Sequence, residues 1–245
     1  MACEIGSTSK KKYLITVIIF VALFAIQFLS SRLGWYVAGL FDCSSLDRDN
    51  LFAQVSIHHI VQVLCGLAAI FLLYKFKNIE GFKLRPEYDA KGVKYTVVFC
   101  VVLGVYYLIV YIVGSFTHTI NTYDYEMNYT NVIGTLGFQL LLSGTSEEIL
   151  FRSLPITLLL SVLDSGSKKD RLIAIISAAV LFGLAHINIF TFSVPAFQVC
   201  YAFVLGIVYG ITFIRTKSVI YPMIMHSLSN VISVGGCYLY MMLVR

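Results

Sequence analysis

Long apolar runs separated by short polar segments set the pattern of this chain. Each run has about the 20 residues that an α-helix needs to cross the hydrocarbon core of a bilayer. The pattern therefore predicts an all-α, polytopic transmembrane helical bundle of seven spans. The runs cover residues 13–29, 51–74, 95–116 and 131–163, a stretch that ends near Phe190, and residues 195–214 and 219–243.

The fourth run is longer than one crossing requires. Either its helix projects beyond the bilayer, or it breaks near Pro155 and resumes, because proline lacks a backbone donor and clashes with the preceding turn. A break would give an eighth span. We divide the single membrane domain into an N-terminal part of three spans, residues 1–130, and a core, residues 131–245.

Composition and charge agree with a membrane protein. The chain is 58% hydrophobic and 13% charged, with a mean hydropathy of +0.83. Segments 10–12, 75–94, 168–171 and 215–217 hold 14 of the 18 Lys and Arg residues. Because cytoplasmic loops carry the excess of basic residues, this asymmetry predicts a cytoplasmic amino terminus. It also argues against nucleic acid as a partner, despite the formal net charge of +5.

Polar and ionisable residues interrupt the apolar runs of the core. Such residues are expensive at membrane depth, and by default they mark a functional site whose members lie on different helices. The candidates are two carboxylates and a guanidinium in the fourth run, an imidazole in the fifth, and an imidazole and an amide in the seventh. They are Glu147, Glu148, Arg152, His186, His226 and Asn230.

Helix geometry gives the two carboxylates different surroundings and therefore different expected roles. Glu148 and Arg152 are four residues apart, with the acid nearer the amino terminus, which favours an ion pair. Glu147 is rotated by about 100° from Glu148 and lacks that partner. We therefore expect Arg152 to fix Glu148 and leave Glu147 free to act as a general base.

The remaining residues suggest two chemistries. In the first, Glu147 and His186 deprotonate water, while His226 and Asn230, one turn apart, stabilise the oxyanion that forms. In the second, Glu147, His186 and His226 bind zinc and Glu148 is the base. We favour the first, with no cofactor, because no H-E-x-x-H motif is present and the ligands would come from three helices.

The hairpin between the fourth and fifth runs predicts the depth of the site. Glu148 and His186 lie almost equally far along the chain from its apex, so they can face each other across antiparallel helices. His226 is only nine residues beyond Lys217 and would be level with them only if the hairpin extends into the cytoplasm. We therefore expect these two helices to protrude, with the site in the inner half of the membrane.

Other polar, aromatic and glycine residues are interpreted as contributing to helix packing or to the membrane interface. The adjacent His58 and His59 point to different faces of a helix, so we expect interfacial or packing histidines. Trp35 is expected in an aromatic belt at the outer interface. Gly206 and Gly210 form a G-x-x-x-G, which we expect to allow close packing inside the bundle and not dimerisation.

The motifs resemble those of the CPBP family, the CAAX proteases and bacteriocin-processing enzymes also called Abi proteins or type II CAAX prenyl endopeptidases. The family pattern of E-E-x-x-x-R, F-x-x-x-H and H-x-x-x-N/D on successive helices is matched in order over residues 146–230. The matching residues are Glu147, Glu148 and Arg152, then Phe182 and His186, then His226 and Asn230.

The resemblance implies an intramembrane glutamate-type endopeptidase. Glu147 and His186 would activate water, and His226 with Asn230 would form the oxyanion hole. The implied partner is a membrane-associated peptide or protein: a prenylated protein, a peptide pheromone or a bacteriocin. The short chain resembles bacterial members, which implies a multi-pass protein of a bacterial cell membrane.

Two non-proteolytic functions remain as alternatives. A membrane immunity or binding protein could use the same bundle to protect against a bacteriocin without catalysis. A proton-coupled transporter would also place carboxylates in the membrane, but the seven runs show no inverted repeat.

Overall fold

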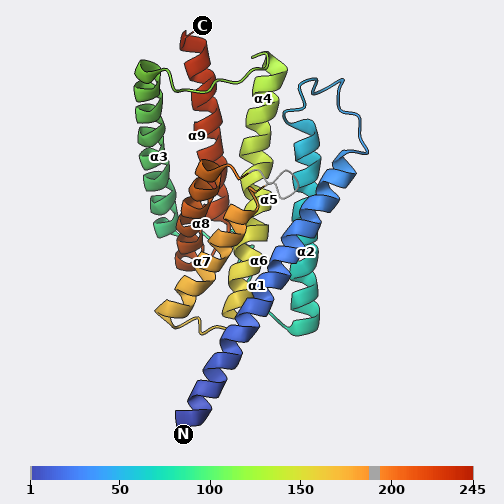
Figure 1. The fold of residues 1–245 in the computed structure, drawn as a ribbon, viewed down its shortest axis with the longest axis vertical. Helices are drawn as coiled ribbons and strands as arrows, with labels where there is room; N and C mark the ends of the chain where they lie inside the picture. The colour runs from blue at the N-terminus through green and yellow to red at the C-terminus, as the bar shows by residue number, and fades with distance from the viewer. Residues whose placement is uncertain (1, 188–193, 245) are drawn as a thin grey trace.

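The computed structural model describes residues 2–187 and 194–244, which form helices joined by loops without a strand. Seven long helical segments run up and down the molecule (Figure 1). The expected helical bundle is confirmed for the described residues. The segments are α1 (Ala2–Ala38), α2 (Ala53–Lys77), α3 (Ala90–Thr117), a compound helix over residues 129–160, α7 (Lys168–Leu184), α8 (Ala196–Thr216) and α9 (Ile220–Val244).

The compound helix carries Glu147 and Glu148 between two π-helical segments, whose wider turns are rare and often lie at functional sites. The alternative of a break near Pro155 does not occur, because Pro155 lies in the first turn of α6 and the helix continues to Leu160. We attribute this to the wide turn directly before it, which relieves the clash of the proline ring. The parts are α4 (Tyr129–Phe138), η1 (Gln139–Ser143), α5 (Gly144–Glu148), η2 (Ile149–Ser153) and α6 (Leu154–Leu160).

The segments that hold the basic residues lie at one end of the bundle. Lys12 of α1 forms an ion pair with Asp170 at the start of α7. The carbonyl of Lys83, between α2 and α3, accepts a hydrogen bond from the backbone N–H of Val219, just before α9. The amino terminus and the α6–α7 connection are both at the lower end of Figure 1. The segments that hold most of the Lys and Arg residues in the sequence therefore also lie together at one end of the folded molecule.

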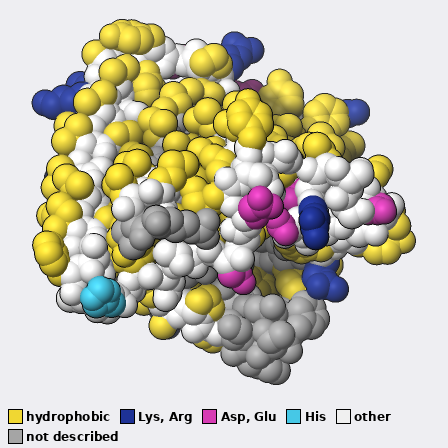
Figure 2. Space-filling model, turned by 90° about the horizontal axis from the view of Figure 1, so that it is seen from above, with side chains coloured by type: hydrophobic (Ala, Val, Ile, Leu, Met, Phe, Trp, Pro, Cys, Tyr) yellow, Lys and Arg dark blue, Asp and Glu magenta, His cyan; other side chains and the backbone are white. Residues whose placement is uncertain are grey.

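The outer faces of the helices are apolar. Many leucine, valine and isoleucine side chains of α1, α2 and α3 are exposed, and hydrophobic side chains cover much of the end view in Figure 2, with few charged ones among them. Lipid tails match such faces, whereas water does not. Four of the described helices are long and apolar enough to cross a membrane: Lys10–Ala38, Ala53–Lys77, Ala90–Thr117 and Ala196–Thr216.

Glycines allow the helices of the core to approach closely. A Cβ atom on Gly206 of α8 would lie 3.0 Å from Ala179 of α7, and Gly210 also abuts α7. The G-x-x-x-G therefore packs inside the bundle, as expected. On α5, a Cβ atom on Gly144 would lie 2.7 Å from the backbone nitrogen of Ser227 of α9. These contacts bring the motif-bearing helices together.

Candidate active site

Glu148, Arg152 and His226 form a buried cluster. The Arg152 Nη1 atom donates to Glu148 Oε1 at 2.7 Å, and His226 Nδ1 lies 2.8 Å from the same oxygen. The side chains of Glu148 and Arg152 are 0% exposed. The expected pair is confirmed, and His226 joins it. Because an ionised carboxylate only accepts hydrogen bonds, this contact puts a proton on His226 Nδ1.

Aromatic rings surround the rest of Arg152. Its guanidinium carbon lies 4.1 Å from the ring centre of Phe182 and 5.0 Å from that of Tyr209. The Nε and Nη2 atoms of Arg152 have no hydrogen-bond partner among the described residues. Cation–π attraction is the interaction that remains for these buried donors. Tyr209 also stacks on His226, with ring centres 5.3 Å apart, so it orients both side chains.

The Glu147 carboxylate lies between two imidazoles. Its Oε2 atom is 3.4 Å from His226 Nε2, and its Oε1 atom is 3.9 Å from His59 Nε2. The Glu147 side chain is 19% exposed, whereas Glu148 is fully buried. The adjacent carboxylates therefore differ as predicted: one is fixed by Arg152, and the other borders open space.

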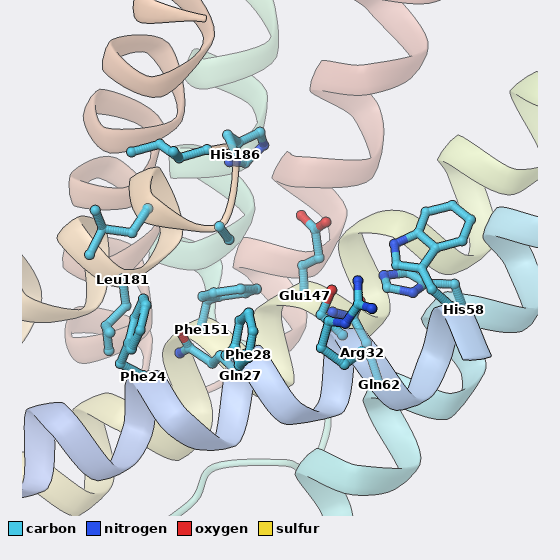
Figure 3. Close-up of a pocket in the computed structure, with 15 residues that line it drawn as sticks. Phe24, Gln27, Phe28, Arg32, His58, Gln62, Glu147, Phe151, Leu181 and His186 are labelled. Carbon is cyan, nitrogen blue, oxygen red and sulfur yellow. The ribbon is translucent and has the colours of Figure 1, made fainter. Parts of the chain in front are cut away.

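Glu147 and His186 line a cavity of about 450 Å³. Its walls come from α1, α2, α7 and the compound helix. Phe24 and Phe151 are on an apolar side, and Gln62 adds a polar group (Figure 3). In Figure 3 the Glu147 carboxylate points into the space on whose far side His186 lies. Glu147 and His186 thus line the same cavity, whereas Glu148, which was expected opposite His186, is turned toward α9.

His186 lies in a turn that follows α7. The helix ends at Leu184, earlier than the expected end near Phe190, which is outside the described residues. The backbone N–H of His186 still bonds to the Gly183 carbonyl, as in a tightened last turn. Its Nδ1 atom lies 2.9 Å from the Phe182 carbonyl, which can only accept, so Nδ1 carries a proton. In the neutral ring Nε2 is then a proton acceptor.

His226 approaches Glu147 from α9, and Asn230 lies one turn further along that helix. Asn230 donates a hydrogen bond to Ser143 Oγ at 2.9 Å. Among the described residues, the lining of the cavity includes Glu147 and His186 but neither His226 nor Asn230. His226 is thus adjacent to the cavity through Glu147, whereas Asn230 contacts Ser143. The second N–H of the Asn230 amide is not used by the bond to Ser143.

His58 and His59 are buried and packed, as expected, and they also lie beside the candidate site. The two histidines do point to different faces of α2, but both faces border the site. His58 lines the cavity and stacks on Trp35 with ring centres 4.4 Å apart, while His59 Nδ1 lies 2.7 Å from Ser146 Oγ. Trp35 therefore lines the cavity as well as reaching the surface. The available signal was two imidazoles in an otherwise apolar run.

The alternative chemistry requires a zinc site. Glu147, His186 and His226 were its expected ligands. Within residues 2–187 and 194–244, no group of three or more His, Cys, Asp or Glu side chains could hold a metal ion. His226 directs both ring nitrogens toward carboxylates instead.

Comparison with known proteins identifies the core. Residues 129–232 match the family model described as type II CAAX prenyl endopeptidase Rce1-like. No curated protein and no solved structure matches the chain. The matched segment begins at the compound helix and contains every motif residue from Glu147 to Asn230. Residues 129–232 are therefore similar to the Rce1-like type II CAAX prenyl endopeptidases, which points to a protease, and the four long apolar helices indicate an integral membrane protein.

Proposed function

We propose that the protein is an intramembrane endopeptidase that hydrolyses a peptide bond of a membrane-associated peptide or protein. The observation that carries the proposal is the position of Glu147. It is the partly exposed member of a glutamate pair, it borders a cavity shared with His186, and its neighbour Glu148 is held by Arg152. A site that keeps one carboxylate fixed and another open to a cavity suits general base catalysis.

In the proposed reaction, a water molecule in the cavity loses a proton to Glu147 as its oxygen attacks the scissile carbonyl carbon. His186 orients that water through the unprotonated Nε2 atom. The tetrahedral intermediate then breaks the carbon–nitrogen bond, and the proton held by Glu147 passes to the leaving amine. No further reactant is required.

The α9 residues would stabilise the oxyanion. The unused N–H of Asn230 is one donor for it. His226 donates from Nε2 only when both ring nitrogens are protonated, because Nδ1 already donates to Glu148. Glu148 and Arg152 support the reaction by holding the His226 ring, and we assign them a positioning role.

The proposed setting is a bacterial cell membrane crossed seven times, with the amino terminus and the site toward the cytoplasm. The grouping of Lys12, Lys83 and the α6–α7 connection at one end of the bundle supports this orientation. Substrates of this location include prenylated carboxyl termini, peptide pheromones and bacteriocins. An apolar and a polar side of one cavity suit a peptide that carries a lipid or an apolar segment.

Comparative peptidomics of membranes would test the proposal. Cells with wild-type protein should contain a fragment that is missing from cells with E147Q, which keeps the size and hydrogen bonding of Glu147 but cannot act as a base. If E147Q protects cells from a bacteriocin as well as the wild type does and no fragment differs, the non-catalytic immunity function is correct. Loss of the fragment after chelation, with metal found in the purified protein, would support the zinc alternative.

A further inference from the structure

His59 of α2 lies outside the matched family segment but contacts the proposed base. Its side chain is 9% exposed, and its Nε2 atom faces Glu147 Oε1 at 3.9 Å. The other carboxylate oxygen of Glu147 faces His226 Nε2 at 3.4 Å. The proposed base is therefore held between an imidazole from the core and one from the N-terminal part of the chain.

Hydrogen bonding assigns the proton of the His59 ring. Ser146 Oγ lies 2.7 Å from His59 Nδ1, 2.8 Å from the Leu142 carbonyl and 3.1 Å from the Ser143 carbonyl. The hydroxyl has one hydrogen, and a carbonyl can only accept. If His59 Nδ1 donated to Ser146, the unprotonated Nε2 of the neutral ring would face a Glu147 carboxylate oxygen, which also only accepts. If the Ser146 hydroxyl donates to Nδ1, Nε2 carries the proton and faces Glu147 as a donor, so this second arrangement is favoured.

The ring of His59 is also held by packing. It meets the edge or face of Phe138 at a centre distance of 5.0 Å and an interplanar angle of 71°. Ser146, its polar anchor, directly precedes Glu147 in the chain. Movement of α5 would therefore carry the anchor and the carboxylate together, which keeps Nε2 directed at Oε1.

We propose that His59 is a positioning residue that fixes the orientation of the Glu147 carboxylate. The inference rests on the proposed function of Glu147. At 3.9 Å the contact is longer than a hydrogen bond, but the electrostatic attraction between the Nε2–H group and the carboxylate oxygen restricts rotation of the carboxylate. With one oxygen toward α2 and the other toward α9, the carboxylate presents a fixed edge to water in the cavity.

Two substitutions separate the two nitrogens of His59. The amide oxygen of H59N replaces Nδ1 and can accept the hydrogen bond of Ser146, but the side chain does not reach Glu147. H59Q places an amide near the position of Nε2, within reach of Glu147. Cleavage of a fluorogenic, farnesylated CAAX peptide in proteoliposomes is the activity probe. H118N is the matched control, because His118 is exposed at the end of α3 with φ of 53°, which Asn tolerates.

We expect H59N to lower kcat about tenfold to a hundredfold with little change in KM, since misplacing a reacting group has effects of this size. H59Q should recover most of the loss, and H118N should match the wild type. Equal kcat values for H59N and the wild type would overturn the proposal. Equal losses in H59N and H59Q, with a raised KM, would show that His59 only shapes the cavity and would also overturn it.

A second readout does not depend on activity. Solid-state NMR of protein with ¹⁵N-labelled histidine, with the His59 signals assigned by their loss in H59Q, should show a protonated Nε2 and an unprotonated Nδ1. A protonated Nδ1 with an unprotonated Nε2 would contradict the proposal. If the wild type cleaves no probe, the proposed function fails for that substrate, while this spectrum still decides whether His59 is anchored as described.

Discussion

His226 Nδ1 lies 2.8 Å from Glu148 Oε1 and so joins α9 to the compound helix. The same oxygen accepts a hydrogen bond from Arg152 at 2.7 Å. One fully buried carboxylate oxygen therefore fixes a cation and an imidazole together. Because Nδ1 of His226 is occupied in this way, the ring can meet Glu147 only through Nε2.

Removing the guanidinium should destabilise the protein strongly. In R152M the buried Glu148 carboxylate loses its cation, which costs about 3–5 kcal/mol in the free energy of unfolding. The double variant E148Q/R152M removes both charges and should be more stable than R152M alone. Denaturant titration in detergent micelles measures these free energies of unfolding. The proteins compared are the wild type, E148Q, R152M and the double variant. If the stability losses of E148Q and R152M simply sum to the loss of the double variant, the two residues are not coupled, and this result would contradict the buried ion pair.

The close packing of α8 on α7 should make Gly206 intolerant of a side chain. A Cβ atom there would lie 3.0 Å from Ala179 and 3.4 Å from Arg152 Nη2, so G206A should lose about 1–3 kcal/mol of stability. At Gly104, in the middle of α3, a Cβ atom would meet nothing within 4 Å. G104A should therefore be neutral or gain up to about 1 kcal/mol from helix propensity. Similar thermal unfolding of the two variants would argue against this packing.

The ion pair between Lys12 and Asp170 should make stability depend on pH. The hydrogen bond from Lys12, helped by one from the backbone of Asp164, lowers the pKa of the Asp170 carboxyl. A lowered pKa stabilises the fold above the ordinary value and loses that effect as the pH falls through the lowered one. D170N should therefore reduce Tm at pH 7, and the difference from wild type should narrow below about pH 4. The exposed Asp124 provides the control, because D124N should leave Tm unchanged at both pH values.

The proposed orientation predicts which loops face the cytoplasm. Ser165 lies between α6 and α7, and Ser45 lies between α1 and α2, and both are exposed. In a background without accessible native cysteines, a membrane-impermeant maleimide added to intact cells should label S45C and leave S165C unlabelled until the cells are opened. The opposite pattern would reverse the topology.

Several features of the fold could be predicted from the sequence because they depend on local pattern. Hydropathy located the helical segments, and the spacing of Glu148 and Arg152 gave their ion pair. The order of the motifs gave the shared cavity of Glu147 and His186. Each prediction used either the length of a membrane span or the period of an α-helix.

Other features depend on how the helices pack, which the pattern does not contain. The place of His59 follows from α2 lying against α5, and nothing in residues 51–74 states which helix is the neighbour. The same holds for Trp35, which was assigned to an interface by its residue type and lines the cavity. The π-helical segments beside Glu147 and the early end of α7 also escaped prediction, because apolar composition does not distinguish these turns from an α-helix.

The most direct test of the account is the cleavage rate of the farnesylated CAAX peptide under single-turnover conditions, for purified wild type and E147Q in proteoliposomes. The wild type should cleave the peptide. E147Q, with an unchanged Tm, should be slower by about 10²- to 10⁴-fold, the contribution expected of a general base. A folded E147Q protein that cleaves within about twofold of the wild-type rate would contradict the role of Glu147 and the mechanism built on it.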